Sequence, residues 1–190
     1  MTLTCGPLVA LVTVLLPVAC NPVTTARPTA AEVRALIGKS HLDDGFFALA
    51  ERFSTQRTAS YYKNGLKTFH HTWRESGFDA SFDADGRCGT VFLYSQEVRE
   101  GGEGERHERY GPYPGEMPFG LTFRDNRDAV LKKLGTDGLD EPTTDDPWMH
   151  RIDYRAKGVG VEFNKPRARI GDPDCRVQMI VLSKPKAADE

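Results

Sequence analysis

The sequence predicts an α+β fold in which short helices pack on an antiparallel β-meander. Three observations predict it: a capped helical pattern begins at residue 29, short aromatic and β-branched segments follow it, and a second helix-to-strand series begins near residue 125. We interpret this order as a tandem repeat of two halves of about 75 residues each. The alternative is one α+β domain whose helix-to-hairpin pattern recurs by chance.

Residues 1–19 have the pattern of an export signal. The apolar run from Leu8 to Val18 contains 11 residues, too few to cross a bilayer core, which needs about 20, but typical of the apolar region of a signal peptide. The stretch Leu-Pro-Val-Ala-Cys resembles the lipobox of bacterial lipoproteins. This resemblance implies that the signal is removed and that Cys20 carries a lipid such as palmitate. The alternatives are ordinary signal cleavage near Ala19 or Ala26, and an uncleaved apolar N-terminus.

Residues 29–97 are predicted to form the first half. Thr29 and Glu32 have the spacing of a capping box. The apolar residues that follow share one helical face, and Gly38 can end the helix. A second helix with a broad apolar face is predicted over residues 43–53.

Three short strands are predicted after these helices, over residues 66–74, 77–83 and 89–95. In the middle strand apolar residues alternate with polar ones, as expected for a strand with one buried face. Asp85-Gly86 lies between the last two strands. This pair predicts a tight hairpin because glycine tolerates positive φ.

Residues 113–185 are predicted to repeat this order. Asp125 can cap a helix that Gly135 ends. Three strands follow, over residues 148–155, 158–164 and 175–183. Three matches occur in the same order in both halves: GFDASFD with GVGVEFN, Trp73 with Trp148, and Cys88 with Cys175. The remaining segments are a tether over residues 20–28, a linker or loop over residues 98–112, and a tail over residues 186–190.

The second half carries a resemblance to known domains. The stretch from Phe119 to Phe123, the helix from Asp125 to Gly135, and Trp148 at the next strand resemble the signature of BamE (SmpA/OmlA) domains. The order of elements in both halves is also similar to the tandem-repeat β-lactamase inhibitor protein. These resemblances imply a short helix pair on an antiparallel meander. The inhibitor family further implies that a concave sheet face and its loops bind a partner. The segment 113–135 is also similar to uncharacterised bacterial domains, some of them suspected toxin-immunity proteins.

Cysteine usage leaves two thiols in the folded body. Cys5 is part of the predicted signal and Cys20 would carry the lipid, so Cys88 and Cys175 remain. They could form one disulfide in an oxidising periplasm. They would stay free if equivalent points of two joined sheets lie further apart than the roughly 7 Å between Cα atoms that a disulfide allows. Both alternatives stay open.

The sequence offers no catalytic or metal-ligating constellation. His70 and His71 are adjacent in a predicted strand and therefore face opposite sides. The carboxylates are scattered over turn-rich stretches, where they usually cap helices or bond local amides. Phosphate-loop, nucleophile-elbow and dinucleotide motifs do not occur, and a net charge of −2 provides no basic excess for nucleic acid. We therefore expect no enzyme activity, no metal and no cofactor.

Tyrosines beside loops are the best candidates for a recognition surface. They are Tyr61, Tyr62, Tyr110 and Tyr113, which lie near glycine and charged residues. Exposed tyrosines are common in protein interfaces. Packing in the core is the alternative role for these rings.

The predicted function is non-catalytic binding of another envelope protein by a bacterial cell-envelope lipoprotein. A lipid on Cys20 would anchor the chain to a membrane. The residue after it is Asn21 rather than aspartate, which in Gram-negative lipoproteins implies sorting to the outer membrane, facing the periplasm. The alternatives are a toxin-immunity-like protein, a small envelope hydrolase or metal-dependent enzyme, and a purely structural envelope protein.

Overall fold

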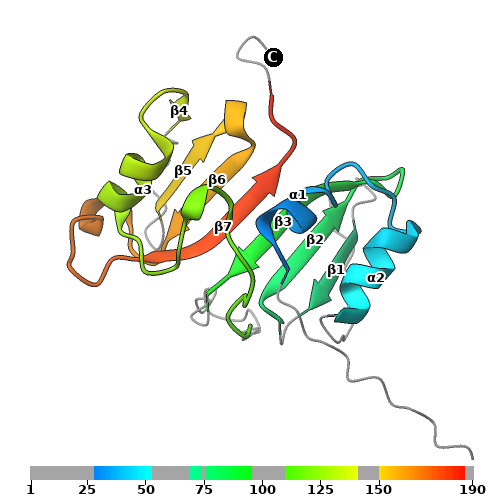
Figure 1. The fold of residues 1–190 in the computed structure, drawn as a ribbon. Coiled ribbons are helices and arrows are strands. Elements are labelled where there is room, and N and C mark those ends of the chain that lie inside the picture. Colours follow the sequence, from blue (N-terminus) through cyan, green and yellow to red (C-terminus); the bar gives the residue numbers. More distant parts are fainter. Residues whose placement is uncertain (1–27, 53–68, 74–75, 96–109, 141–149, 187–190) are drawn as a thin grey trace, which may run out of the picture.

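A computed structural model describes residues 28–52, 69–73, 76–95, 110–140 and 150–186. Within these ranges the chain is a mixed α/β protein dominated by a seven-stranded antiparallel sheet, ordered β1-β2-β3-β7-β6-β5-β4 (Figure 1). The strands are β1 (Phe69–Trp73), β2 (Phe78–Phe82), β3 (Cys88–Tyr94), β4 (Leu139–Asp140), β5 (His150–Tyr154), β6 (Val159–Phe163) and β7 (Val177–Ser183). The predicted antiparallel meanders are confirmed, whereas the two-residue strand β4 was not predicted.

Two meanders meet at the centre of this sheet. The last strand of each, β3 and β7, pair with each other in antiparallel register. The register of β2 on β3 shifts between Ser81 and Phe82, and that of β6 on β7 shifts between Glu162 and Phe163. One continuous sheet therefore contains both predicted halves. The middle strand of each meander, β2 in the first and β6 in the second, has a register shift before its last residue.

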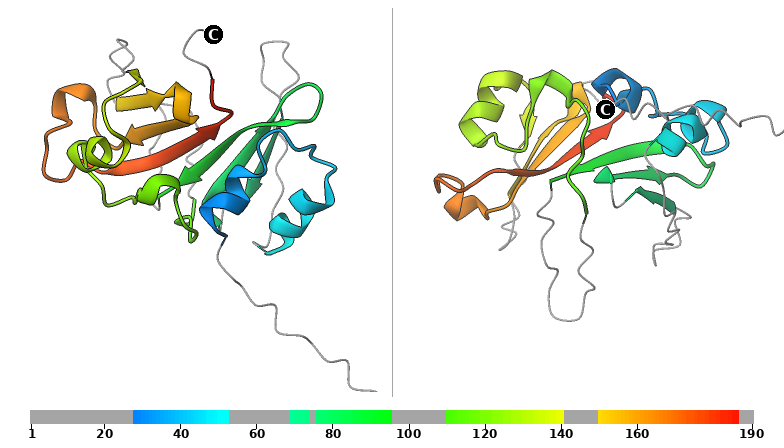
Figure 2. Two further views of the ribbon diagram at one scale, coloured as in Figure 1. Left: turned by 45° about the horizontal axis from the view of Figure 1, so that its top comes forward. Right: turned by 60° about the horizontal axis from the view of Figure 1, so that its bottom comes forward.

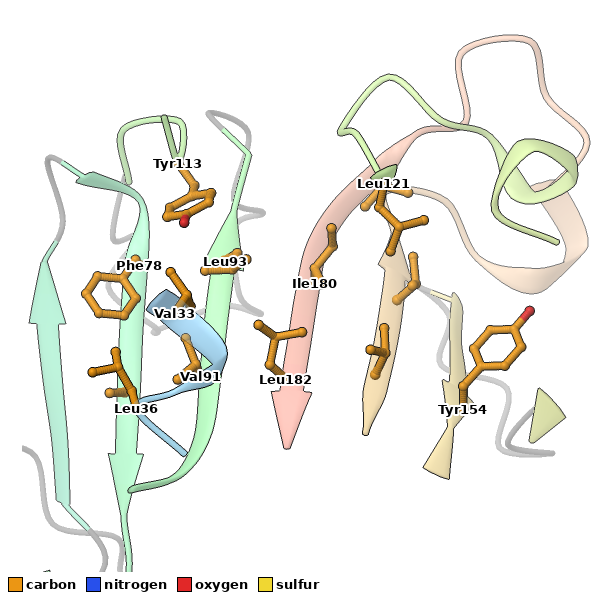
Figure 3. Packing of buried hydrophobic residues seen from close by; sticks show 14 of the residues in the cluster. Val33, Leu36, Phe78, Val91, Leu93, Tyr113, Leu121, Tyr154, Ile180 and Leu182 are labelled. Atoms are coloured by element: carbon orange, nitrogen blue, oxygen red, sulfur yellow. The ribbon is translucent and has the colours of Figure 1, made fainter. Parts of the chain in front are cut away.

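The α-helices lie on one side of the sheet, as the right-hand view of Figure 2 shows. They are α1 (Ala30–Arg34), α2 (Asp44–Arg52) and α3 (Arg127–Leu134). The expected helix pair is present as α1 and α2, whereas the second half contributes α3 and the short 3-10 turn η2 (Pro118–Gly120) in the described ranges. Alternation along the strands turns one apolar set toward these helices. In Figure 3, Val33 of α1 and Leu36, which follows the end of that helix, lie beside Phe78 and Val91 of the sheet.

The helix ends follow local chemistry. The predicted capping box is confirmed: the Thr29 side chain accepts from the Glu32 amide, and Glu32 reaches back to the Thr29 amide. For α3, however, the predicted cap is wrong by one residue. Asn126 caps the helix by accepting from the Ala129 amide. Asp125 instead accepts from the Thr122 amide and pairs with Lys133 at 2.7 Å.

The capping box makes the stability depend on pH. Hydrogen bonds from the Thr29 amide, the Arg52 side chain and the Thr29 hydroxyl lower the pKa of Glu32 to about 2, from 4.5. A lowered folded-state pKa contributes stability above the unfolded value, and this contribution disappears as pH falls toward the folded value.

We therefore expect Glu32→Gln to lower the free energy of unfolding at pH 7. The deficit should shrink between about pH 4.5 and pH 2. Urea titrations across this range measure it, with exposed Glu116→Gln as the matched charge-removal control. A deficit that stayed constant with pH would show that the Glu32 charge is not responsible.

Candidate functional site

The face of the sheet opposite the helices is the candidate functional surface, and we call it the open face. Its residues alternate with the core residues in the six longer strands. They are His70, Thr72, Asp79, Ser81, Thr90, Phe92, Tyr94, Met179, Val181, Ser183, Gly160, Glu162, Arg151 and Asp153. This set combines aromatic rings, buried carboxylates and arginine. No α-helix of the described residues covers it (Figure 2).

An aromatic row crosses the first half of the open face. The ring of His70 in β1 stacks on Phe92 in β3 with centroids 6.0 Å apart, and Phe92 stacks on Tyr94 at 6.5 Å. Tyr94 in turn stacks on Tyr110 at 4.1 Å. Burial lowers the pKa of His70, which favours its neutral form. The row is therefore an uncharged aromatic surface, which is the type of surface enriched in protein interfaces.

A buried carboxylate fixes the end of this row. Asp79 is 5% exposed and accepts hydrogen bonds from Tyr110 at 2.8 Å and from Tyr94 at 3.1 Å. Burial, followed by the nearby Asp79 charge, raises the pKa of Tyr94 far above its usual value. Both hydroxyls therefore remain protonated donors, and the two stacked rings are held rigidly against the sheet.

A second buried carboxylate lies across the central strands. Glu162 in β6 accepts from the side-chain amide of Gln178 at 2.7 Å. Gln178 stands at the point where β7 shifts register, between the residues that pair with Glu162 and Phe163. Both side chains are buried, at 7% and 5% exposure. The open face thus contains two buried carboxylates, Asp79 and Glu162. Each accepts at least one hydrogen bond from an uncharged side chain.

A shallow cationic pocket occupies the second half of the open face. It has a volume of about 180 Å³ and is lined by Arg151, Asp153, Arg155, Val159, Gly160, Val181, Ser183, Lys184 and Lys186. Arg151 pairs with Asp153 at 2.8 Å, and Arg155 pairs with Asp140 at 2.6 Å. A Cβ on Gly160 would lie 2.4 Å from an Asp153 oxygen, so glycine lets the Arg151–Asp153 pair lie flat on the sheet.

A larger polar pocket lies at the end of the sheet where β3 stops. The Ser95 amide donates to the Gln178 carbonyl, and one residue earlier the Val177 amide donates to the Asp125 carbonyl. The segment before α3 thus replaces β3 alongside β7. The pocket between these segments has a volume of about 740 Å³ and is lined by Ser95, Phe123, Arg124, Asn164, Asp174, Arg176, Val177 and Gln178.

Tyr110 and Tyr113 are both buried, which agrees with the packing alternative rather than with exposed recognition residues. Tyr110 is 8% exposed and belongs to the aromatic row, while Tyr113 is 5% exposed and belongs to the core. Figure 3 shows Tyr113 on the same side of the sheet as α1. Their positions beside glycines suggested exposed loops, but the loop packs on the sheet. Tyr61 and Tyr62 lie outside the described residues, as does Cys20.

We expect Tyr110→Phe to keep the ring stack and lose the hydrogen bond to buried Asp79. A hydrogen bond to a charged group contributes roughly 1.5–3 kcal/mol, so the free energy of unfolding should fall by about 2 kcal/mol. Urea unfolding measures this loss. Tyr113→Phe is the control, because no partner of its buried hydroxyl is found among the described residues. Equal losses in the two variants would contradict the role given to Tyr110.

The possible disulfide between Cys88 and Cys175 is not formed; both are free, buried thiols. The register of β3 on β7 explains why. Thr90 pairs with Ser183, which places position 88 opposite position 185, about 30 Å of extended strand from Cys175. Burial raises the pKa of Cys88 to about 12 and also raises the pKa of Cys175. Both thiols are therefore protonated and poorly reactive at neutral pH.

The described residues contain no group of histidine, cysteine, aspartate and glutamate side chains placed to hold a metal ion. Within the same ranges, no helix is both long and apolar enough to cross a membrane. Comparison of the chain with protein-family models, curated proteins and solved structures gives no match in any of the three. The resemblance to BamE and inhibitor domains therefore stays a prediction.

Three residues of the candidate surface were not predicted from the sequence: Phe92, Glu162 and Gln178. The strand period of two was the signal that could have found them. Once Phe78 and Val161 are assigned to the core face, their alternating neighbours define the other face. Gln178 was harder to find, because the register shift beside it breaks the alternation.

Proposed function

We propose that this protein is a cell-envelope lipoprotein that binds another envelope protein, without catalysis, through the open face of its sheet. The observation that carries the proposal is the aromatic row from His70 to Tyr110, placed on the face that the helices leave uncovered. Phe92, Tyr94 and Met179 are partly exposed there. Rigid aromatic rings beside methionine provide contact area at low entropic cost, as is typical of binding surfaces.

The anchoring part of the proposal rests on the N-terminal sequence. The apolar run, the segment Leu-Pro-Val-Ala-Cys and Asn21 support export, lipidation of Cys20 and sorting to the outer membrane, with the folded body facing the periplasm. The first helix begins at Ala30, shortly after the proposed tether. A short tether would hold the body close to the membrane surface.

A tandem origin of the two halves is part of the same proposal. Gly77 and Gly158 precede the middle strands with the same φ of 61°. Each accepts at its carbonyl a hydrogen bond from the end of the next long strand, from Tyr94 and Ser183 respectively. In this alignment Trp73 corresponds to Tyr154, not to Trp148. The match of GFDASFD with GVGVEFN supports the repeat.

Photo-crosslinking in intact cells tests the binding function. A benzophenone amino acid replaces Phe92 on the open face in one strain and Phe119 in a control strain. Phe119 is 44% exposed and lies beside Arg34 of α1, on the helix side. We expect one discrete protein adduct from position 92 and none from position 119.

The adduct should also disappear when Met179→Lys is added, because this change places a charge on the open face beside Tyr94. Circular dichroism must show that this variant is folded. Absence of an adduct at position 92, or an equal adduct at both positions, would overturn the proposed surface.

Metabolic labelling with a palmitate analogue tests the anchor. The wild-type chain should take up the label and fractionate with outer membranes, whereas Cys20→Ser should remain unlabelled. Label that persisted in Cys20→Ser, or no label on the wild type, would remove the lipid from the proposal.

A further inference from the structure

The pocket at the end of β3 has the lining of a carboxylate site. Two arginines, Arg124 and Arg176, line it from different segments of the chain. Neither forms an ion pair with another described residue; Arg176 donates to the Cys175 carbonyl at 2.6 Å. Guanidinium groups bind carboxylates with two parallel hydrogen bonds, and such charge-assisted bonds are roughly twice as strong as neutral ones. The pocket therefore offers uncompensated positive charge.

The acidic groups near the pocket are already occupied. Asp174 also lines it, but its carboxylate pairs with Lys165 at 2.6 Å. Glu162 does not line the pocket, and it accepts a hydrogen bond from the side-chain amide of Gln178, which does. An incoming anion therefore meets two arginines, while each nearby carboxylate is held by its own donor.

A buried hydrogen-bond acceptor without a donor among the described residues narrows the class of ligand that fits this pocket. The Gln178 side chain is 5% exposed and lines the pocket, and its Oε1 has no hydrogen-bond partner in the described part of the chain. Its Nε2 is already used by Glu162, which fixes the orientation of the amide. A buried acceptor without a donor is costly, so the site is best completed by a ligand that carries an N–H group.

Part of the pocket lining is apolar. Phe123 is half-buried and Val177 is buried, and both line the same pocket. A fitting ligand therefore combines a carboxylate, a neighbouring N–H group and an apolar side chain. The last residue of a polypeptide has this combination, because its backbone N–H and its terminal carboxylate are attached to the same Cα.

We propose that this pocket binds the free C-terminal carboxylate of a peptide with an apolar last residue. Arg124 and Arg176 hold the carboxylate, Gln178 accepts from the last backbone N–H, and Phe123 contacts the side chain. The inference rests on the proposed function, because it makes the peptide the C-terminus of the protein bound at the adjoining open face.

NMR titration of the purified full chain with a tetrapeptide library tests the proposal. The library has a free C-terminal carboxylate, an apolar last residue and mixed residues elsewhere. We expect dose-dependent shifts of the Arg124 and Arg176 Nε–H signals and of the Gln178 side-chain amide, with binding in the millimolar range or tighter. The same library with an amidated C-terminus should give no shifts.

Charge-matched variants separate this pocket from general attraction to basic residues. Arg124→Gln with Arg176→Gln should weaken binding at least about tenfold. Lys184→Gln with Lys186→Gln removes the same charge from the cationic pocket of the second half and should leave binding unchanged. Amide-proton signals must show that both variants are folded.

The proposal would be overturned by an absence of shifts at millimolar library, by equal shifts with the amidated library, or by equal weakening in both double variants. A third library, with glutamate inside the sequence and an amidated end, identifies recognition of acidic side chains. If it binds as well as the free-acid library, the C-terminal assignment is wrong. Loss of peptide binding with a persistent adduct at position 92 would remove this inference alone; peptide binding without that adduct would remove the proposed surface.

Discussion

Replacing Gly77 by alanine should lower the free energy of unfolding by about 4 kcal/mol, which is at the upper end of single-residue effects. Gly77 has a φ of 61° immediately before β2. A Cβ there would lie 2.2 Å from the Gly111 carbonyl oxygen and 2.4 Å from the Tyr113 amide nitrogen. The left-handed conformation alone costs a non-glycine residue about 1–2 kcal/mol. The remainder comes from displacing the backbone that crosses this position.

A matched glycine separates these two costs. Gly120 has a similar φ of 66°, but a Cβ on it would meet no atom within 4 Å. Gly120→Ala should therefore lose only about 1–2 kcal/mol. Urea unfolding of both variants measures the difference, and the melting temperature of Gly77→Ala should fall by about 10 °C. Losses of the same size would show that the close approach of residues 111–113 to β2 is wrong.

This close approach also affects the candidate site. The segment that passes over Gly77 lies between Tyr110, at the end of the aromatic row, and Tyr113, in the core. A displacement of this segment in Gly77→Ala should therefore weaken binding at the open face as well as stability. Gly158→Ala is expected to be similarly destabilising, because its Cβ would lie 2.3 Å from the Ser183 carbonyl oxygen.

The parts of the fold that were predictable are those set by local chemistry. The capping box at Thr29, the hairpin glycine Gly86 with its φ of 72°, and the helix end at Gly135 depend on residues close in sequence. Alternation also identified the core residues of β2 and β6, because one buried face gives a period of two. The predictions of these elements are confirmed, and the local interactions on which they were based are present in the structure.

The parts that were wrong, left open or not predicted depend on long-range packing. Asp125 and Asn126 are both good caps, and only the contact with Lys133 decides that Asp125 serves elsewhere. Tyr110 lies in a stretch without periodicity, and its burial comes from contacts with Asp79 and Tyr94. The separation of the cysteines follows from the β3–β7 register, which no local pattern encodes. The candidate pocket likewise joins four distant segments of the chain.

Removing the ring of Phe82 should cost about 4 kcal/mol, whereas removing the ring of Phe92 should cost less than half of this. Phe82→Ala empties a fully buried position, where its ring meets those of Phe46 and His71 at 5.0 Å each. Deletion of a buried phenylalanine side chain typically costs 3–5 kcal/mol. Phe92 lies on the open face, is only partly buried and keeps contacts with His70 and Tyr94 alone among the aromatic rings described.

The two variants should therefore have opposite functional consequences. Phe92→Ala should remain folded at 25 °C and lose most of its partner binding, because the middle ring of the aromatic row is absent. Phe82→Ala should bind normally in whatever fraction stays folded, since it faces the helices and not the partner. Urea unfolding together with binding of the crosslinked partner, once purified, measures both effects. Normal binding by folded Phe92→Ala would show that the aromatic row is structural, and the open face would then lose the observation on which its proposed function depends.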